Sequence, residues 1–125
     1  MKKERIIELL KPFNLLKHEY CVVASGSLVM HGILEEAGDL DLVVDENGFE
    51  KIRKLYPDIY QREDGWYTVT DEIEIVIGTV TKSFFEGYPV QDLDELLRFY
   101  QGRNEEKDKI RIDKIHKFFF EKQFK

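Results

Sequence analysis

The sequence predicts an α/β protein of the α+β type, in which helices flank a single mixed β-sheet and two further helices follow at the C-terminus. The first observation is the order of patterns: helical and strand-like runs alternate until residue 77, and only helical runs follow residue 90. The second is the length of 125 residues, typical of one domain, with no repeat or linker that divides the range 1–125. The third is a hydrophobic content of 42%, which is enough for a buried core.

The N-terminal part of the chain alternates helices with strands. Apolar residues recur at helical spacing over residues 3–11, and Pro12 ends or bends this helix. The runs that follow predict a buried strand at 20–24, a short helix at 27–34 and a second strand at 40–44. The link between the two strands is short, so the sequence does not decide whether they pair in parallel.

The middle of the chain is expected to be rich in strands. A turn at residues 45–48 precedes a helix over residues 49–56, which stops at Pro57. Further strands are expected at 59–62, 65–69 and 73–77, and residues 88–90 resemble an extended lead-in. In the strand 73–77 the isoleucines face one side of the sheet, whereas Glu74 faces the other.

The C-terminal part is expected to form two helices. Asp92 and Glu95 are spaced like a capping box and open the first of them, which Gly102 ends. Asn104 can cap the last helix, in which isoleucines and phenylalanines from Ile110 onward form an apolar stripe.

Composition and charge narrow the classes of function and the compartment. The formal net charge of −6 disfavours general nucleic-acid binding, which needs basic residues to neutralise phosphates. The single cysteine, Cys21, cannot form an internal disulfide and suggests a reducing compartment. The N-terminus lacks the apolar core of a signal peptide, and no apolar run is long enough to span a membrane. We therefore expect a cytoplasmic protein without a membrane partner.

Two short motifs carry the chemistry of the sequence. The pair Gly26-Ser27 precedes a predicted helix, where backbone N–H groups, a hydroxyl and the positive end of a helix dipole can hold phosphate. Asp39 and Asp41 lie two residues apart, so both carboxylates project from one face of a strand. A phosphate-binding turn beside two metal-binding carboxylates is the arrangement that metal-dependent phosphoryl or nucleotidyl transfer requires.

Together with the acid in Ile73-Glu74-Ile75, these motifs resemble those of the nucleotidyltransferase superfamily, which includes DNA polymerase β-like enzymes. Members of that superfamily carry a Gly-Gly or Gly-Ser turn, then an Asp-apolar-Asp pair, and a third acid on a distant strand. The stretch from Val90 to Leu97, followed by Gly102-Arg103 and Lys107-Asp108, is similar to the C-terminal helices of small bacterial members. Some of those members belong to toxin–antitoxin systems.

The resemblance implies a nucleotidyltransferase-like fold and a Mg²⁺-dependent reaction. An NMP group would move from an NTP, such as ATP, to a hydroxyl acceptor with release of pyrophosphate. Asp39 and Asp41 would hold one or two Mg²⁺ ions, and Glu74 would bind the second ion or take the proton of the attacking hydroxyl. The residues implied to contact the nucleotide phosphates are Gly26, Ser27 and Lys107. A partner protein or a second protomer would help to bind a large acceptor.

Each assignment has an alternative that the sequence leaves open. Gly26-Ser27 can be a plain strand-to-helix turn, and Asp39 and Asp41 can be solvated residues of an edge strand. Glu74 can lie on the solvated face of a strand, and Lys107 can be a solvated residue near a helix start. The third acid is Glu where Asp is commoner in the family, and no basic or hydroxyl residue directly precedes the first acid. The alternative function is a catalytically degenerate nucleotide-binding protein or an antitoxin-like regulator.

Overall fold

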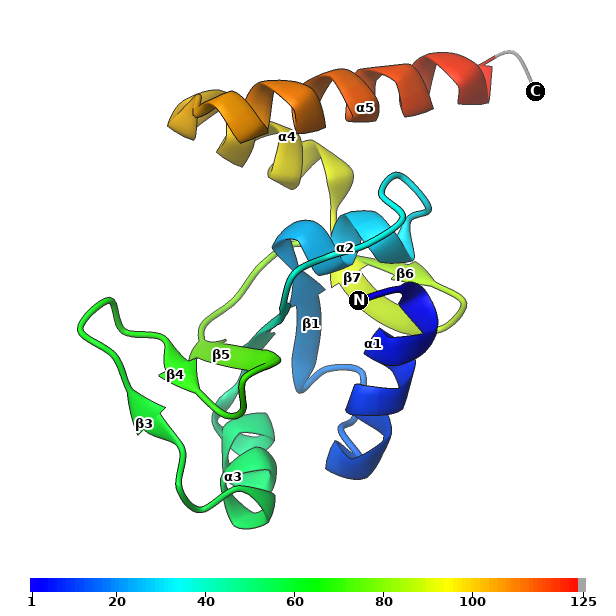
Figure 1. The fold of residues 1–125 in the computed structure, drawn as a ribbon. Coiled ribbons are helices and arrows are strands. Elements are labelled where there is room, and N and C mark those ends of the chain that lie inside the picture. The colour runs from blue at the N-terminus through cyan, green and yellow to red at the C-terminus, as the bar shows by residue number, and fades with distance from the viewer. Residues whose placement is uncertain (124–125) are drawn as a thin grey trace. The chain divides into compact units, whose positions relative to one another are not determined.

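A computed structural model describes residues 1–123 of the chain, which form two compact units (Figure 1). The first unit is Met1–Gln91, and the second begins at Asp92. The predicted fold class is confirmed, because the described residues form one mixed sheet of seven strands and five α-helices, the last two of them C-terminal. The single-domain organisation expected for residues 1–125 stays a prediction. None of the helices in this part of the chain is long and apolar enough to cross a membrane.

The sheet belongs to the first unit and contains both parallel and antiparallel neighbours. Across the sheet the strands are β3 (Tyr60–Gln61), β4 (Tyr67–Thr68), β5 (Ile73–Ile77), β2 (Leu40–Val44), β1 (Tyr20–Val23), β7 (Tyr88–Gln91) and β6 (Lys82–Phe85). Strand β1 is antiparallel to β2, whereas β2 is parallel to β5. A parallel pair needs a crossover, and helix α3 (Glu46–Leu55) with the β3–β4 hairpin supplies it. Figure 1 shows this hairpin at one edge of the sheet, beyond β5.

The two faces of the sheet differ in how they are covered. One face carries the main core, where alternate residues of β2 and β5, such as Leu40 and Ile73, pack with apolar residues of α1 (Lys3–Leu10), α2 (Ala24–Met30) and α3. Alternation along the strands directs the residues in between to the other face. A smaller buried cluster forms there from Cys21, Val23 and Val43, with Trp66, Val76 and Val80 packed against it. The polar side chains of β2 and β5 lie on this second face.

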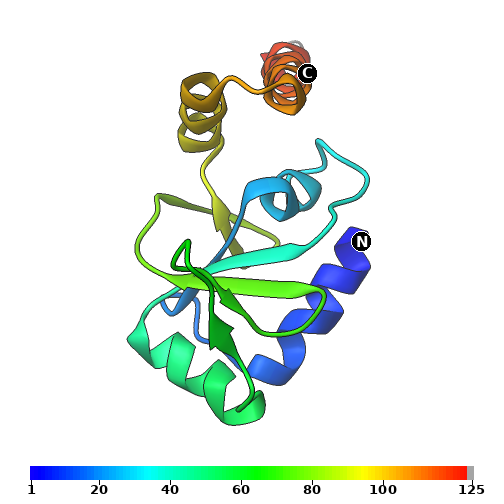
Figure 2. The same cartoon turned by 60° about the vertical axis from the view of Figure 1, so that its left-hand side comes forward.

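Helix α2 begins three residues earlier than expected, at Ala24, and ends at Met30. Gly26-Ser27 therefore lies inside the helix and not in a turn before it. Ala24 itself makes the turn, with a left-handed φ of 57°, and its N–H donates to the side-chain oxygen of Gln91. Figure 2 shows α2 continuing directly from β1. Helix α1 ends in the 3-10 turn Lys11–Phe13, which contains the expected proline.

Two further elements depart from the expected boundaries. The turn expected at 45–48 is the first turn of α3, because the Asp45 carboxylate accepts the Gly48 N–H as a helix N-cap. Strand β6 has no counterpart in the sequence prediction. It forms an edge of the sheet and pairs with β7, and its apolar Phe84 is exposed. An edge strand need not alternate clearly between apolar and polar residues, so its pattern is weak.

The second unit consists of two helices, α4 (Leu93–Arg103) and α5 (Glu106–Gln123). The predicted N-cap of the first is confirmed. The Asp92 carboxylate accepts the backbone N–H groups of Asp94 and Glu95, which would otherwise lack partners at the helix start.

The boundary between α4 and α5 differs from the prediction. Helix α4 continues past Gly102, and Asn104 ends it in the left-handed conformation, with a φ of 54°. Asparagine tolerates this conformation at a helix C-terminus, so it takes the role that the sequence suggested for the glycine. Asn104 therefore ends α4 and does not cap α5. Helix α5 begins at Glu106, where the Asp108 carboxylate reaches back to the Glu105 N–H at 2.9 Å.

An ion pair closes the turn between these two helices. Arg103 donates from Nε, at 2.9 Å, and from Nη2 to the two carboxylate oxygens of Asp108. The Asp108 side chain is completely buried, and a buried carboxylate is tolerated only when it is paired. The hydrogen bonds from Arg103 lower the pKa of Asp108 to about 2. This pair therefore joins the end of α4 to the start of α5.

We expect Asp108→Asn to loosen the α4–α5 hairpin at neutral pH, because Arg103 then loses its buried anionic partner. Folding lowers the pKa of Asp108 from 3.8 to about 2, so its contribution to stability is complete above the unfolded pKa and is lost as the pH falls through the folded one. Hydrogen–deuterium exchange of the helix amides measures the effect when it is followed from neutral pH down through the interval between these two pKa values. The difference in amide protection between wild type and variant should shrink as the pH falls through that interval.

The exposed Asp113 on the same helix provides the control for this prediction. Asp113→Asn should leave exchange unchanged. Equal protection of wild type and Asp108→Asn at neutral pH would show that the ion pair does not hold the hairpin.

Candidate functional site

Acidic side chains gather on the second face of the sheet, where β2 and β5 begin. Asp41 and Glu74 are register partners on these parallel strands. Their neighbours Leu40 and Ile73 belong to the main core, so the two carboxylates project from the opposite face. Adjacent strands lie about 4.8 Å apart, which brings both side chains within reach of one divalent ion. Asp39 directly precedes β2, two residues before Asp41, and is therefore expected on the same face.

The three carboxylates differ in exposure. Asp39 is exposed, Asp41 is partly buried, and the Glu74 side chain is 27% exposed. On its other side Asp41 pairs with Val23, the last residue of β1 before α2. The acids thus lie at the end of the sheet where β1 leads into that helix. Like charges on neighbouring strands repel, and a cation between them would remove the repulsion.

A basic residue that the sequence did not single out contacts this group. Arg62 donates from Nη1 to Oε1 of Glu74 and forms two further hydrogen bonds with Asp64, at 3.3 and 2.9 Å. Hydrogen bonds with Asp64, and then with Glu74, raise the pKa of Arg62. The backbone N–H of Arg62 donates to Trp66 at 2.7 Å. This cross-strand bond holds Arg62 in the β3–β4 hairpin beside β5, and no local pattern in the sequence indicates that Arg62 is a neighbour of Glu74.

The choice of Glu74 among neighbouring acids has a structural basis. Glu72 accepts two hydrogen bonds from Arg5 of α1, at 3.2 and 2.6 Å, and this pairing lowers its pKa. Asp71 is exposed and lies before β5 begins. Glu74 is the acid of this segment that lies in register with Asp41. Its role as a metal ligand or base stays a prediction.

Gly26 and Ser27 have structural contacts inside the first unit. The Ser27 side chain is completely buried, and its hydroxyl donates to the backbone carbonyl of Gln91 at 3.0 Å. His31 Nε2 lies 3.1 Å from the same oxygen. A Cβ on Gly26 would lie 3.1 Å from Val22 Cγ1, so glycine permits close packing of α2 on β1. The more accessible hydroxyl of this motif belongs to Ser25, which is partly buried.

The resemblance implied Lys107 of the second unit as a phosphate ligand, and Arg103 belongs to the same stretch of the chain. Arg103 is held by the buried Asp108 carboxylate, so it has a structural partner. Lys107 is 59% exposed, and its ammonium lies 3.7 Å from the Glu105 carboxylate. An exposed pair of this kind is weak, so solvent ions or a ligand could replace it.

The donor chemistry of the acids suits Mg²⁺, a hard cation that prefers carboxylate oxygens. Asp39, Asp41 and Glu74 offer only such oxygens. Within residues 1–123, no group of three or more histidine, cysteine, aspartate or glutamate side chains is arranged as a metal site. The fit of Mg²⁺ therefore rests on the donor type and on the strand register.

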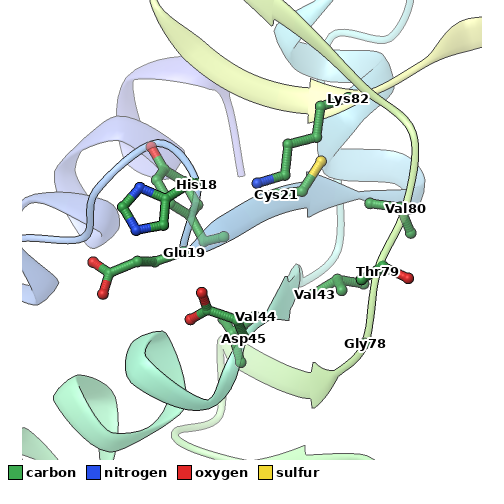
Figure 3. Close-up of a pocket in the computed structure, with 11 residues that line it drawn as sticks. His18, Glu19, Cys21, Val43, Val44, Asp45, Gly78, Thr79, Val80 and Lys82 are labelled. Carbon is green, nitrogen blue, oxygen red and sulfur yellow. The ribbon is translucent and has the colours of Figure 1, made fainter.

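A separate pocket of about 90 Å³ lies at the opposite end of the same strands, beside Tyr20 and Val44 (Figure 3). Figure 3 shows the carboxylates of Glu19 and Asp45 on one side of it and Lys82 on the other. The acids have structural partners, since Glu19 binds Lys51 and the Leu16 N–H, and Asp45 caps α3. Pockets for ligands of nucleotide size usually measure about 300 Å³ or more. This pocket is too small for a nucleotide.

The chain has no significant match among protein-family models, curated proteins or solved structures. Function is therefore inferred from the residues and their geometry.

Replacing Ser27 by alanine should lower the free energy of unfolding by about 1 kcal/mol, the usual net value of one hydrogen bond. The lost bond is the one from the buried hydroxyl to Gln91. Ser25→Ala is the matched control and should change stability by less than about 0.5 kcal/mol, because Ser25 is less buried. Urea unfolding of both variants measures the difference. Equal stabilities would mean that the Ser27 hydroxyl does not support α2.

Proposed function

We propose that the protein is a Mg²⁺-dependent nucleotidyltransferase that moves an NMP group from an NTP to a hydroxyl acceptor. The observation that carries this proposal is the register of Asp41 with Glu74 on parallel strands, with Asp39 two residues from Asp41. Three oxygen-donor side chains at one end of a sheet suit divalent ions and a triphosphate. The reducing compartment suggested by the single cysteine favours the cytoplasm, where NTPs are made.

The carboxylates would divide the chemical work. Asp39 and Asp41 would hold one or two Mg²⁺ ions, which when bound neutralise charge on the attacking and leaving oxygens. Glu74 would complete the ligand set or accept the proton of the acceptor hydroxyl. The hydroxyl oxygen forms a bond to the α-phosphorus, and the bond from that phosphorus to the bridging oxygen of the β-phosphate breaks. Pyrophosphate leaves with the bonding electrons, and the proton goes to the carboxylate.

The start of α2 is the proposed contact for the phosphates. The first N–H groups of a helix have no partner within it, and those of Ser25 and Gly26 belong to this turn. Ser25 is the more accessible of the two, so we expect its N–H and hydroxyl to make the first contact. Lys107 belongs to the second unit, and its contact with the phosphates stays a prediction that rests on the resemblance alone.

A second candidate function has its own supporting observation. Glu74 is bound by Arg62, and the Ser27 hydroxyl is bound by Gln91, so two groups of the proposed site already have partners within the protein. A catalytically degenerate nucleotide-binding protein, or an antitoxin-like regulator, would retain such contacts. Nucleotide binding without release of pyrophosphate would favour this candidate.

Asp41→Asn is the sharpest test of the proposed function. The variant removes one negative charge but keeps the shape of the side chain, so Mg²⁺-dependent binding of a non-hydrolysable NTP should weaken by about 100-fold or more. Pyrophosphate release should be lost to the same extent. Without Mg²⁺, the melting temperature should stay equal or rise, because a like charge beside Glu74 is removed. Calorimetry, a pyrophosphate assay and thermal melting measure these effects.

Asp71→Asn is the matched control, since Asp71 is an exposed acid of the turn before β5. It should bind the NTP as wild type does. If the wild-type protein binds no NTP in the presence of Mg²⁺, the proposed function is wrong. If wild type and Asp41→Asn bind equally well, the metal site lies elsewhere.

A further inference from the structure

Arg62 is a cation that the fold holds at the edge of the acidic group. The two hydrogen bonds with Asp64 use Nε and Nη2, so one edge of the guanidinium is fixed to its own hairpin. Asp64 also accepts the Trp66 N–H at 3.0 Å, which ties this carboxylate to the same turn. The remaining nitrogen, Nη1, is directed at Glu74. The hairpin thus presents a positioned positive charge to the carboxylates.

The Arg62 side chain is also partly exposed. The Arg62 side chain is 32% exposed and that of Glu74 is 27% exposed. Arginine carries more N–H donors than these three hydrogen bonds use, so further donors can bind an anion while the contact with Asp64 stays in place. The planar fork of these donors matches the oxygens of a phosphate group.

Charge balance shows why such a group is needed. A triphosphate placed beside Asp39, Asp41 and Glu74 brings more negative charge to a site that is already acidic. Divalent ions bound by the carboxylates neutralise part of it, and the remaining charge of the phosphates needs another cation. Arg62 is a basic side chain that contacts one of the three acids.

We propose that Arg62 is a triphosphate-binding residue that Glu74 holds in place until the nucleotide arrives. In the ligand-free protein the guanidinium neutralises Glu74. When a divalent ion takes the Glu74 carboxylate, Nη1 turns to the terminal phosphates of the nucleotide, and Asp64 keeps the hairpin edge of the guanidinium fixed. Arg62 and the divalent ion therefore compete for Glu74, but they cooperate in binding the triphosphate. This inference rests on the proposed nucleotidyltransferase function and names a residue that determines its specificity for triphosphates.

A static ion pair that only supports the hairpin is the competing explanation. The two explanations differ in the sign of two measurable effects. If Arg62 competes with the ion, its removal strengthens binding of Mg²⁺ alone, since a neighbouring positive charge is lost. If it binds phosphate, its removal weakens binding of the Mg²⁺–NTP complex. A purely structural residue would not move the two affinities in opposite directions.

The experiment is calorimetry on the full chain with Arg62→Gln, Arg62→Lys and Arg53→Gln. Arg53 is the matched control, because it forms an exposed ion pair with Glu50 on α3, outside the site. The probes are Mg²⁺ alone, a non-hydrolysable NTP with Mg²⁺, and the corresponding NMP with Mg²⁺. Thermal melting of each variant checks that it is folded. If Arg62→Gln does not fold, Arg62→Lys, which keeps the charge, takes its place in the experiment.

Arg62→Gln should bind the NTP roughly 10- to 100-fold more weakly, as expected for loss of charge-assisted hydrogen bonds. It should bind Mg²⁺ alone more tightly and leave NMP binding unchanged. Arg62→Lys should lie between wild type and Arg62→Gln, and Arg53→Gln should match wild type. Unchanged NTP binding by Arg62→Gln, or an equal loss for NTP and NMP, would overturn the inference while leaving the proposed function intact. If wild type binds no NTP, whereas Asp41→Asn and wild type are both folded, both proposals fail.

Discussion

The parallel pairing of β2 with β5 is the constraint on which both the core and the candidate site depend. Its register places Leu40 beside Ile73 and Asp41 beside Glu74. Because side chains alternate with a period of two, sliding one strand by a single residue would turn its isoleucines to solvent and its acid into the core. Each buried aliphatic side chain contributes about 1.5–3 kcal/mol, and burial of an unpaired carboxylate costs several more. The apolar residues therefore hold the acids together on the other face.

At the acidic end of the sheet, the carboxylates that suit a metal site also repel each other, and this repulsion lowers the stability of the fold. Carboxylates on adjacent strands repel each other unless a cation lies beside them. The contact from Arg62 to Glu74 removes part of that repulsion, and Asp39 avoids it by its exposure to water. A group of like charges that the fold keeps, although it is unfavourable, is typical of functional sites.

Two arginine–carboxylate pairs of this chain illustrate how burial separates structural from ligand-binding roles. Asp108 is completely buried and accepts hydrogen bonds from Arg103 and from the Glu105 backbone, so a ligand could replace Arg103 only by leaving a buried charge unpaired. Glu74 is partly exposed, and water or an ion can take the place of Arg62 at modest cost. The same chemistry therefore closes a helical turn in one unit and leaves an exchangeable contact in the other.

Local pattern in the sequence was enough to identify the strands at 40–44 and 73–77, whose bounds the structure reproduces, and to direct Asp39, Asp41 and Glu74 away from the apolar face of their strands. Periodicity reports which side of its own strand a residue faces, and that information is local. Tertiary structure alone decided that β2 lies between β1 and β5, that Glu74 stands next to Asp41, and that Arg62 reaches Glu74. It also decided that the Ser27 hydroxyl binds Gln91, which lies far along the chain. These contacts depend on the register between distant segments, and no local pattern encodes that register.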